Sequence, residues 1–370
     1  MKKYIALLLA LSMLLCGCEL IPTRESYEQA HRATTAAPTE ATEEPTAEPT
    51  TEPTTEPTTE PPPVYTNPLN GEILDGPFDG RIFAFTVSNV PDAIPHVGVV
   101  EADILMEMFV NGSVIRCLAL FSEPVKTHSI GSVRSTRLMF NDIAQHYDAV
   151  LCHAGGSEQV LANARSRGID NFNIDSWQIA EAGTSYRDSD RSRTLGWEHC
   201  LLALGQGVVD YANSVGVATT REPDTRYGLE FVEDGTPEGG ENAGIINITF
   251  KFGTSAKDTI MRYDETLGGY IYNQYNKDMA DGLTNAPECF ENVVIIHADI
   301  TKDGMYHVTD FVTGGDGYYA CGGKLIPMKW HCDSDSSPLY FTTVDGEPLF
   351  FGTGNSYFAI CPLGSPLSYE

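Results

Sequence analysis

Residues 149–157 read Ala-Val-Leu-Cys-His-Ala-Gly-Gly-Ser and carry the clearest local signal for the fold. Four apolar residues in succession indicate a short buried strand. Two glycines then supply a turn, and Ser157 is a residue type that often begins a helix. We therefore expect a strand over Ala149–Cys152 and a helix over Ser157–Arg167, joined by the turn at Gly155 and Gly156. This connection is typical of a layered protein that contains both strands and helices.

The same mixture of patterns extends through residues 67–218. Continuous or alternating apolar residues predict strands, and apolar residues three or four apart predict helices. The expected strands are Ile82–Val87, Asp103–Val110 and Val114–Phe121, and the further helices are Arg134–Tyr147 and Trp197–Val215. Strands and helices in this order predict an α/β or α+β domain over residues 67–218.

The composition changes at residue 219. Residues 219–244 are rich in Asp, Glu, Gly, Pro and Thr, which indicates a linker or a long functional loop. Residues 245–370 contain short strand-like runs separated by glycine and aspartate turns, and this pattern predicts a mostly β domain. The expected strands are Ile245–Phe252, Tyr270–Tyr272, Val293–His297, Tyr306–Val312, Tyr318–Ala320, Leu339–Thr343 and Tyr357–Ile360.

The N-terminus has the pattern of an export signal. Two lysines precede an apolar run from Ile5 to Leu15, which is too short for a stable membrane span. Leu15 and Gly17 lie three residues and one residue before Cys18, as in a lipobox. We expect residues 1–18 to be a lipoprotein signal peptide and Cys18 to carry acyl chains such as palmitate. The alternative is an ordinary secretory signal with incidental cysteines.

Residues 19–66 have almost no large apolar side chains and repeat the tetrapeptide Thr-Glu-Pro-Thr. Such a segment cannot bury a core, so we expect a disordered tether that holds the folded part away from the membrane, within a cell wall. A lipid on Cys18 would then be the membrane anchor, and the protein would lie on the outer, extracytoplasmic face.

The charge restricts the partners. The net charge of the chain is −28, and residues 67–370 keep about −22 of it. An acidic surface of this kind repels nucleic acid and other anionic polymers, so any anion site has to be local and built from clustered arginines.

Seven cysteines follow Cys18, with wide and irregular spacing. An odd number at such spacing fits neither a disulfide framework nor a zinc site, although Cys321 and Cys332 could pair. The acidic stretch Asp333–Ser337 lacks the glycine and the glutamate of a calcium loop. The sequence therefore predicts no metal site and no cofactor.

Several segments match one known family in order along the folded part. The sequence resembles the YerB-type family of bacterial lipoproteins, which has two domains and no established biochemical activity. The matching segments are Asn67–Gly71, Ser88–Asn89, Pro95, Glu101–Ile104, Glu107, Arg116, Ile130–Ser135, Tyr147–Ala149, His153–Ser157 and Tyr186–Asp188, and, less specifically, Asn292–Val294, Trp330 and Asp345–Pro362. The sequence departs from the family after Arg191. Where the family has Ala-Pro-His-Asn, this chain has Arg193-Thr194-Leu195-Gly196-Trp197, so any chemistry of that histidine and asparagine would be lost here.

Arginine and hydroxyl side chains gather in the motifs that follow the expected strands. Guanidinium groups bind carboxylate or phosphate bidentately, and a helix start beside glycines offers backbone amides to an anion. The predicted ligand-binding residues are Arg134, Ser135, Arg137, His153, Gly155, Gly156, Ser157, Arg187 and Arg191. In the alternative, the glycines only provide a tight turn. The arginines then form internal ion pairs, Arg134 or Arg116 with Glu107 or Asp188.

Two carboxylates are candidate acids or bases. Glu107 is expected on the same strand face as Leu105 and Phe109, where it would either pair with Arg116 or have a raised pKa. Asp188 could act with His153. No complete catalytic signature is present, however.

Two functions are consistent with these observations. The first is a lipid-anchored extracytoplasmic protein that binds a component of the cell envelope, either a cell-wall polymer or an envelope protein. The second is an enzyme that acts on an anionic envelope glycan, with Glu107 or Asp188 as the acid or base and Arg134, Arg137 and Arg187 as an anion clamp. Convergence of these side chains on an open cleft would support a site.

Overall fold

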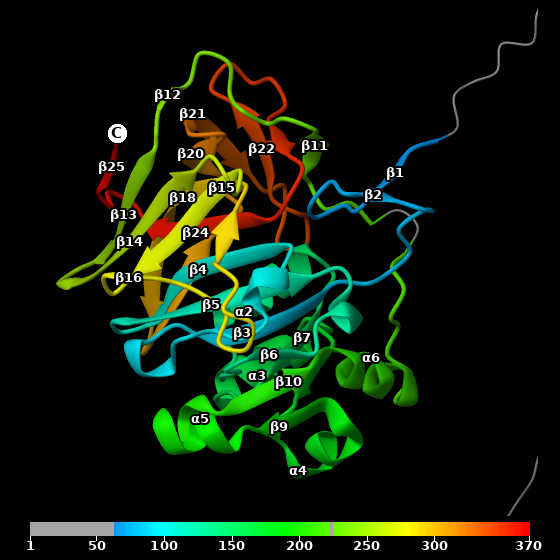
Figure 1. Cartoon of the computed structure of the whole chain (residues 1–370). Helices are drawn as coiled ribbons and strands as arrows, with labels where there is room; N and C mark the ends of the chain where they lie inside the picture. Colours follow the sequence, from blue (N-terminus) through cyan, green and yellow to red (C-terminus); the bar gives the residue numbers. More distant parts are fainter. Residues whose placement is uncertain (1–62, 223–224) are drawn as a thin grey trace, which may run out of the picture. The chain divides into compact units, whose positions relative to one another are not determined.

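A twelve-stranded sheet contains strands from both halves of the sequence (Figure 1). It belongs to the computed structural model of the chain, which describes residues 63–222 and 225–370. Across the sheet the strands follow the order β12 (Glu241–Asn242), β21 (Lys324–His331), β20 (Gly315–Cys321), β18 (Asn292–Asp303), β19 (Tyr306–Asp310), β4 (Ile104–Asn111), β5 (Val114–Phe121), β3 (Phe83–Ser88), β7 (Val150–His153) and β8 (Asn171–Asn173), with β22 (Tyr340–Thr343) beside β21.

The strand β24 (Ser356–Pro362) joins the two halves of this sheet. It pairs in parallel with β18 on one side and with β4 on the other, so that Ala359 lies opposite both Ile295 and Glu107. Every residue of β24 is buried. The expected division of the chain at residues 219–244 is therefore not accompanied by a break in the sheet, and the domain boundaries themselves stay a prediction.

A six-stranded sheet covers one face of the large sheet. It consists of β16 (Lys277–Asp278), β15 (Gly269–Gln274), β14 (Ser255–Asp264), β13 (Ile245–Phe252) and β25 (Leu367–Tyr369), with β17 (Cys289–Phe290) beside β15. Phe250 of β13 packs edge-on against Phe109 of β4 at a centroid distance of 6.4 Å. One hydrophobic core lies between the two sheets.

Helices cover part of the opposite face of the large sheet. In α2 (Leu138–His146), Met139 and Phe140 are fully buried in a second hydrophobic core with Met106 of β4 and Leu118 of β5. The helix α3 (Glu158–Ser166) packs beside α2. Because strands such as β4 have a core on each face, their sequences are continuously apolar rather than alternating.

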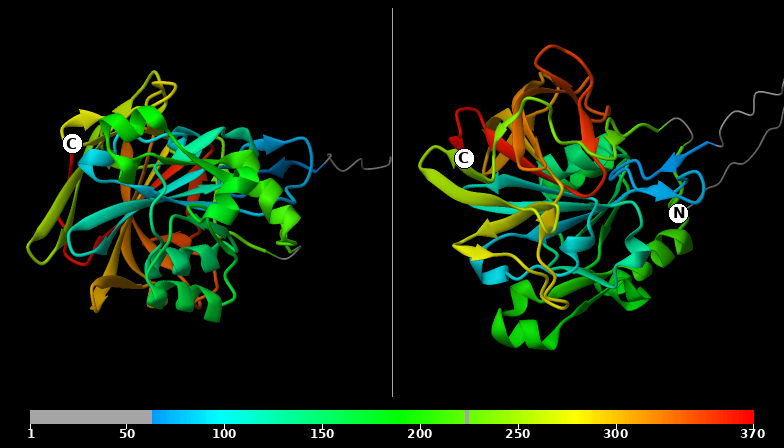
Figure 2. Two further views of the ribbon diagram at one scale, coloured as in Figure 1. Left: turned by 90° about the horizontal axis from the view of Figure 1, so that it is seen from below. Right: turned by 45° about the horizontal axis from the view of Figure 1, so that its top comes forward.

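A small lobe lies at the bottom of the molecule in Figure 1. Its sheet has the order β6 (Ser129–Gly131), β10 (Leu201–Leu204), β9 (Ser185–Arg187). Figure 2 shows its short helices from two further directions. They are α4 (Trp177–Ile179), α5 (Ser189–Thr194) and α6 (Gly205–Ser214), with a π turn at Ala180–Thr184. Short 3-10 turns lie at Pro91–Ala93, Val99–Glu101, Pro124–Lys126 and Trp197–His199, and two small sheets pair β1 (Tyr65–Thr66) with β2 (Ile73–Leu74) and β11 (Glu230–Val232) with β23 (Phe350–Gly352).

The predicted fold class is confirmed, because the first half mixes strands with helices and the second half is almost entirely strands. Two predicted helices were wrong in their extent. The strand β10 interrupts the expected helix Trp197–Val215. The helix predicted from Arg134 begins only at Leu138, since residues 133–137 are extended and bonded to neighbouring strands. The sequence also gave no indication of β14 or β21.

The seven cysteines of the described residues are free thiols, and the possible pair Cys321–Cys332 is not formed. Burial raises the pKa of the Cys117 and Cys361 thiols, so they behave as small apolar side chains. Within residues 63–222 and 225–370, no helix combines the length and the apolar character needed to cross a membrane. The signal peptide, Cys18 and most of the predicted tether lie outside the described residues.

Candidate functional site

The two motifs around Arg134 and Gly155 lie side by side. The Ala154 amide donates to the Arg134 carbonyl oxygen at 2.9 Å, and the Thr136 amide donates to the Gly155 carbonyl oxygen at 3.0 Å. The Ser135 hydroxyl donates to the Ala154 carbonyl oxygen at 2.9 Å. The segment before α2 is therefore held against the turn that follows β7 by main-chain hydrogen bonds and by the Ser135 hydroxyl.

The strand β10 brings a third segment to the same place. Leu201 of β10 pairs with Arg187 at the end of β9, and its carbonyl oxygen accepts from the Val133 amide at 2.8 Å. A pocket of about 270 Å³ opens between these segments. We call it the arginine pocket; it is lined by Val133, Arg134, Ser135, Ala154, Asp175, Arg187, Trp197, Glu198 and Leu201.

Each arginine of the arginine pocket is bonded to a carboxylate and to a main-chain oxygen. Arg134 contacts the Glu198 carboxylate at 3.0 Å and the Glu198 carbonyl oxygen at 2.7 Å. Arg187 contacts the Asp175 carboxylate at 2.6 Å and the Trp197 carbonyl oxygen at 2.8 Å. The predicted alternative of internal ion pairing thus describes both arginines, but the expected partners Glu107 and Asp188 were wrong.

Trp197 gives the arginine pocket an aromatic wall. The Arg187 guanidinium lies 4.1 Å from the centroid of the indole ring, a cation–π contact. About two thirds of Trp197 is exposed, which is unusual for so large an apolar side chain. Trp197 ends the segment Arg193–Trp197, in which the sequence departs from the family it resembles.

A further arginine, Arg116, contacts the backbone of Ser135, which lines the arginine pocket. Arg116 is almost completely buried and donates to the Ser135 carbonyl oxygen at 2.7 Å. No described carboxylate lies within ion-pair distance of it. Burial, together with the charges of Arg137 and Arg134, lowers the pKa of Arg116 to about 9.

Two predicted arginines lie outside the arginine pocket. Arg137 donates to the Asn111 side chain at 3.2 Å and lies over the Tyr306 ring, and it is not among the residues that line the pocket. Arg191 is buried and donates to the carbonyl oxygens of Ala93 and Pro95, both at 2.9 Å. Arg191 is therefore a structural tie between the small lobe and the loop after β3.

His153 and the helix start have local partners. His153 is buried between the Gly155 carbonyl oxygen at 2.9 Å and the Asn171 side-chain oxygen at 3.1 Å, and burial lowers its pKa. The Ser157 hydroxyl accepts from the Val160 amide and so caps α3 itself. Gly155 has a φ of +76°, a conformation that favours glycine, whereas a Cβ at Gly156 would come within 3.2 Å of the Leu161 side chain and would require only a small shift of it.

The expected acids and bases do not reach the arginine pocket. The Asp188 carboxylate accepts from the Arg191 amide at 2.7 Å and caps α5, so no pair of Asp188 with His153 is formed. Glu107 shares a strand face with Leu105 and Phe109, as predicted, but it is fully buried between the two large sheets. The predicted pair of Glu107 with Arg116 was wrong, since Arg116 is opposite Met108 and faces the other side of the sheet.

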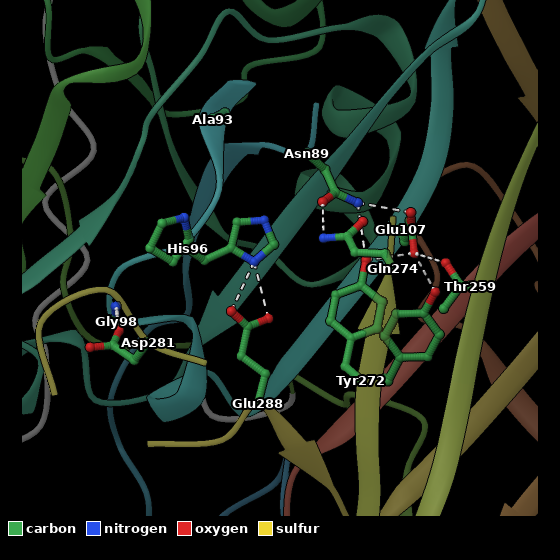
Figure 3. Close-up of polar contacts among 12 residues, drawn as sticks. Asn89, Ala93, His96, Gly98, Glu107, Thr259, Tyr272, Gln274, Asp281 and Glu288 are labelled. Carbon is green, nitrogen blue, oxygen red and sulfur yellow. Dashed lines mark hydrogen bonds and ion pairs between the residues drawn. The ribbon is translucent and has the colours of Figure 1, made fainter. Parts of the chain in front are cut away.

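A dense set of donors surrounds Glu107 (Figure 3). It accepts from the Asn89 amide at 2.8 Å, the Tyr272 hydroxyl at 3.0 Å and the Thr259 hydroxyl at 3.1 Å. The Lys257 ammonium and the Tyr357 hydroxyl also donate to it. Five donors leave this carboxylate no free position for a substrate, so we interpret it as a structural link between β4 and the six-stranded sheet.

Figure 3 also shows a buried pair that the sequence did not indicate. His96, in the loop after β3, lies 3.0 Å from the Glu288 carboxylate, and neither side chain is exposed. Nearby, the Asp281 carboxylate accepts from the Gly98 amide at 2.5 Å. These contacts again connect the first half of the sequence to the second.

A second polar cleft, of about 400 Å³, lies beside β2 and β23 and is lined in part by Asn67, Asn70 and Asp103. The Asp103 carboxylate accepts from the Asn70 amide at 2.7 Å and from the Ser122 backbone at 2.6 Å. Burial raises the pKa of Asp103 to about 6. These residues belong to segments that carry the family resemblance, but no catalytic pattern in the sequence had marked them as a site.

The structure thus brings together Arg134, Ser135 and Arg187 of the predicted residues. It adds Asp175, Trp197 and Glu198. Trp197 and Glu198 were missed because they were assigned to the start of the predicted helix Trp197–Val215, and no motif marked Asp175. Within the described residues, no group of three or more His, Cys, Asp or Glu side chains is placed to hold a metal ion.

Comparison with known proteins agrees with the architecture. A solved crystal structure of the YerB protein from Bacillus subtilis superposes with a TM-score of 0.69 at 21% identity, covering 82% of this chain and 99% of that chain. The Bacillus subtilis (strain 168) protein described as "Putative lipoprotein YerB" is 24% identical over 287 residues, which are 76% of this chain and 81% of that protein. Residues 70–214 match the N-terminal domain and residues 248–358 the C-terminal domain of a protein family of unknown function, DUF3048, so the chain belongs to the DUF3048 family, in agreement with the YerB-type resemblance.

Proposed function

We propose that this protein is a lipid-anchored, extracytoplasmic binding protein that holds a small polar group of a cell-wall polymer in the arginine pocket. The observation that carries the proposal is the convergence of Arg134, Ser135 and Arg187 with the exposed Trp197 around one opening. The lipid anchor is supported by the lipobox-like Leu15-Cys16-Gly17-Cys18 sequence and by the lipoprotein description of the Bacillus subtilis relative.

The dimensions of the pocket favour a polymer group over a protein partner. Stable protein interfaces bury on the order of 800 Å² on each partner and are usually flat. A pocket of about 270 Å³ instead encloses a group of one or two residues or sugar units. An envelope protein would need further contacts around the opening.

The side chains favour binding over catalysis. Glu107 has five donors and no exposed surface, and Asp188 caps a helix, so neither is available as an acid or base in the arginine pocket. The carboxylates that do line the pocket, Asp175 and Glu198, are each held by an arginine. Guanidinium groups and an indole ring are suited to orienting a ligand, which is the chemistry of recognition.

The test is binding of the full-length protein, in detergent, to purified cell walls and to their soluble fragments. Arg187→Ala should weaken binding at least tenfold, because it removes a bidentate donor and the support of Trp197. The matched control is Arg165→Ala, an exposed arginine on α3 whose partner is Glu158 and which lies outside the pocket lining. Equal binding by the wild-type protein and Arg187→Ala would refute the proposal.

A further inference from the structure

The charges that line the arginine pocket cancel. Arg134 and Arg187 contribute two positive charges, and Asp175 and Glu198 contribute two negative charges. An empty anion site is usually left positive, whereas here each guanidinium already has a carboxylate partner. The ligand therefore has to exchange partners with existing ion pairs.

The positively charged side chains of the pocket are more deeply buried than the negatively charged ones. The side chains of Arg134 and Arg187 are 24% and 23% exposed, whereas their partners Glu198 and Asp175 are 71% and 38% exposed. The buried Arg116 adds another positive charge, bonded to the carbonyl oxygen of Ser135 in the pocket lining. The pocket is thus positive at its inner end and negative at its mouth.

This polarity disfavours a ligand that carries only negative charge. Such a ligand could bind the arginines only by displacing Asp175 and Glu198, and both displaced carboxylates would stay close to it. The net charge of about −22 on residues 67–370 would also repel it at long range. A ligand with one positive and one negative group avoids the unpaired carboxylates and the long-range repulsion. Its negative group pairs with the arginines, its positive group pairs with the displaced carboxylates, and its net charge is zero.

From this geometry we infer that the arginine pocket binds a zwitterion, namely an α-amino acid or the free end groups of a short peptide. The ligand carboxylate replaces Glu198 and Asp175 on the arginines, and the ligand ammonium binds the displaced carboxylates at the mouth. The inference rests on the proposed function and narrows it to the peptide portion of the wall polymer. The pocket volume of about 270 Å³ equals about nine water molecules, enough for one or two small residues.

Partner exchange of this kind costs little. Ion pairs that are partly exposed to solvent contribute little to stability, so opening them is a small penalty beside the new charged contacts. The segment that carries Trp197 and Glu198 is held to the arginines by its own carbonyl oxygens as well. The indole ring can therefore stay over Arg187 while the Glu198 carboxylate moves, and its apolar face is available to the ligand side chain.

The experiment compares three dipeptide probes on the full-length protein in detergent, by calorimetry and by tryptophan fluorescence. Alanyl-alanine has both charged ends, N-acetyl-alanyl-alanine has only the carboxylate, and alanyl-alaninamide has only the ammonium group. We expect alanyl-alanine to bind at least tenfold more tightly than either blocked probe. The double variant Asp175→Asn, Glu198→Gln should reverse the preference, so that N-acetyl-alanyl-alanine binds best. The control Glu158→Gln, on α3 and outside the pocket lining, should leave the order of the probes unchanged.

The outcomes separate this inference from the proposed function. If N-acetyl-alanyl-alanine binds the wild-type protein as tightly as alanyl-alanine, the zwitterion inference is wrong and a plain anion site remains. If none of the dipeptides binds but wall fragments bind in a way that depends on Arg187, the peptide class is wrong and the binding function stands. If neither dipeptides nor wall fragments show binding that depends on Arg187, both proposals fail.

Discussion

Lys257 of β14 and Glu107 of β4 form an ion pair in the core between the two large sheets, where Glu107 has no exposed surface and Lys257 almost none. The two residues are 150 positions apart in the sequence. Since buried charges are costly unless paired, this contact fixes how the six-stranded sheet is placed on the twelve-stranded sheet.

Lys257→Met should destabilise the protein strongly. The substitution removes the cation and leaves the Glu107 carboxylate buried with only neutral donors, which costs about 3–5 kcal/mol in the free energy of unfolding. Urea unfolding followed by tryptophan fluorescence measures this loss. The double variant Lys257→Met, Glu107→Gln removes both charges and should recover part of the stability. A loss below about 1 kcal/mol in the single variant would show that the pair is not a structural link.

Arg191→Ala and Arg134→Ala should differ in stability although both remove an arginine, the first from α5 and the second from the segment before α2. Arg191→Ala leaves the buried Ala93 carbonyl oxygen without this donor, at about 1–3 kcal/mol, and also removes a donor from the partly buried Pro95 carbonyl oxygen. Arg134 is paired with the exposed Glu198, so its removal should cost about 1 kcal/mol or less. Similar urea midpoints for the two variants would contradict this assignment of roles.

The pH dependence of stability should contain a contribution from Asp103. Burial raises its pKa in the folded protein from 3.8 to about 6, so the folded protein holds this proton more tightly than the unfolded chain does. The contribution to stability is therefore present at low pH and is lost as the pH rises through about 6. Urea unfolding at pH 4.5 and pH 7 should show that the stability of the wild-type protein relative to Asp103→Asn falls over this range. A constant difference would mean that the pKa is not raised.

Cys18 should be the lipidated residue, because Leu15 and Gly17 precede it as in a lipobox. Mass spectrometry of the mature N-terminus should detect a diacylglyceryl cysteine at position 18. Cys18→Ala should release the protein from membranes or block its maturation. Cleavage at another residue, without lipid, would make the anchor prediction wrong.

The strands were predictable where a local apolar run was enough to define them, as for β5, β13 and β7. The strand β14 was missed because it is half exposed and carries Lys257, whose partner is known only once the two sheets are assembled. The order of strands in the sheet had no local signal at all, since β24 pairs with a strand some 250 residues earlier.

The candidate site was predictable in part for the same reason. Arg134, Ser135 and Arg187 stood out because their residue types suit anions. Arg137 and Arg191 have the same chemistry, but hydrogen bonds to distant carbonyl and amide oxygens direct them elsewhere. Trp197 and Glu198 were missed because the pattern after residue 197 suggested one long helix, whereas β10 separates this turn from α6.

The central position of β24 has a consequence for biosynthesis. Until Pro362 has been synthesised, β4 and β18 have no strand between them, and their open edges are free to pair with other chains. Parallel pairing across so long a stretch of sequence is also slow to form. The large sheet can therefore close only when nearly all of the described chain is available, and a chaperone that shields β4 and β18 until then would reduce pairing between chains.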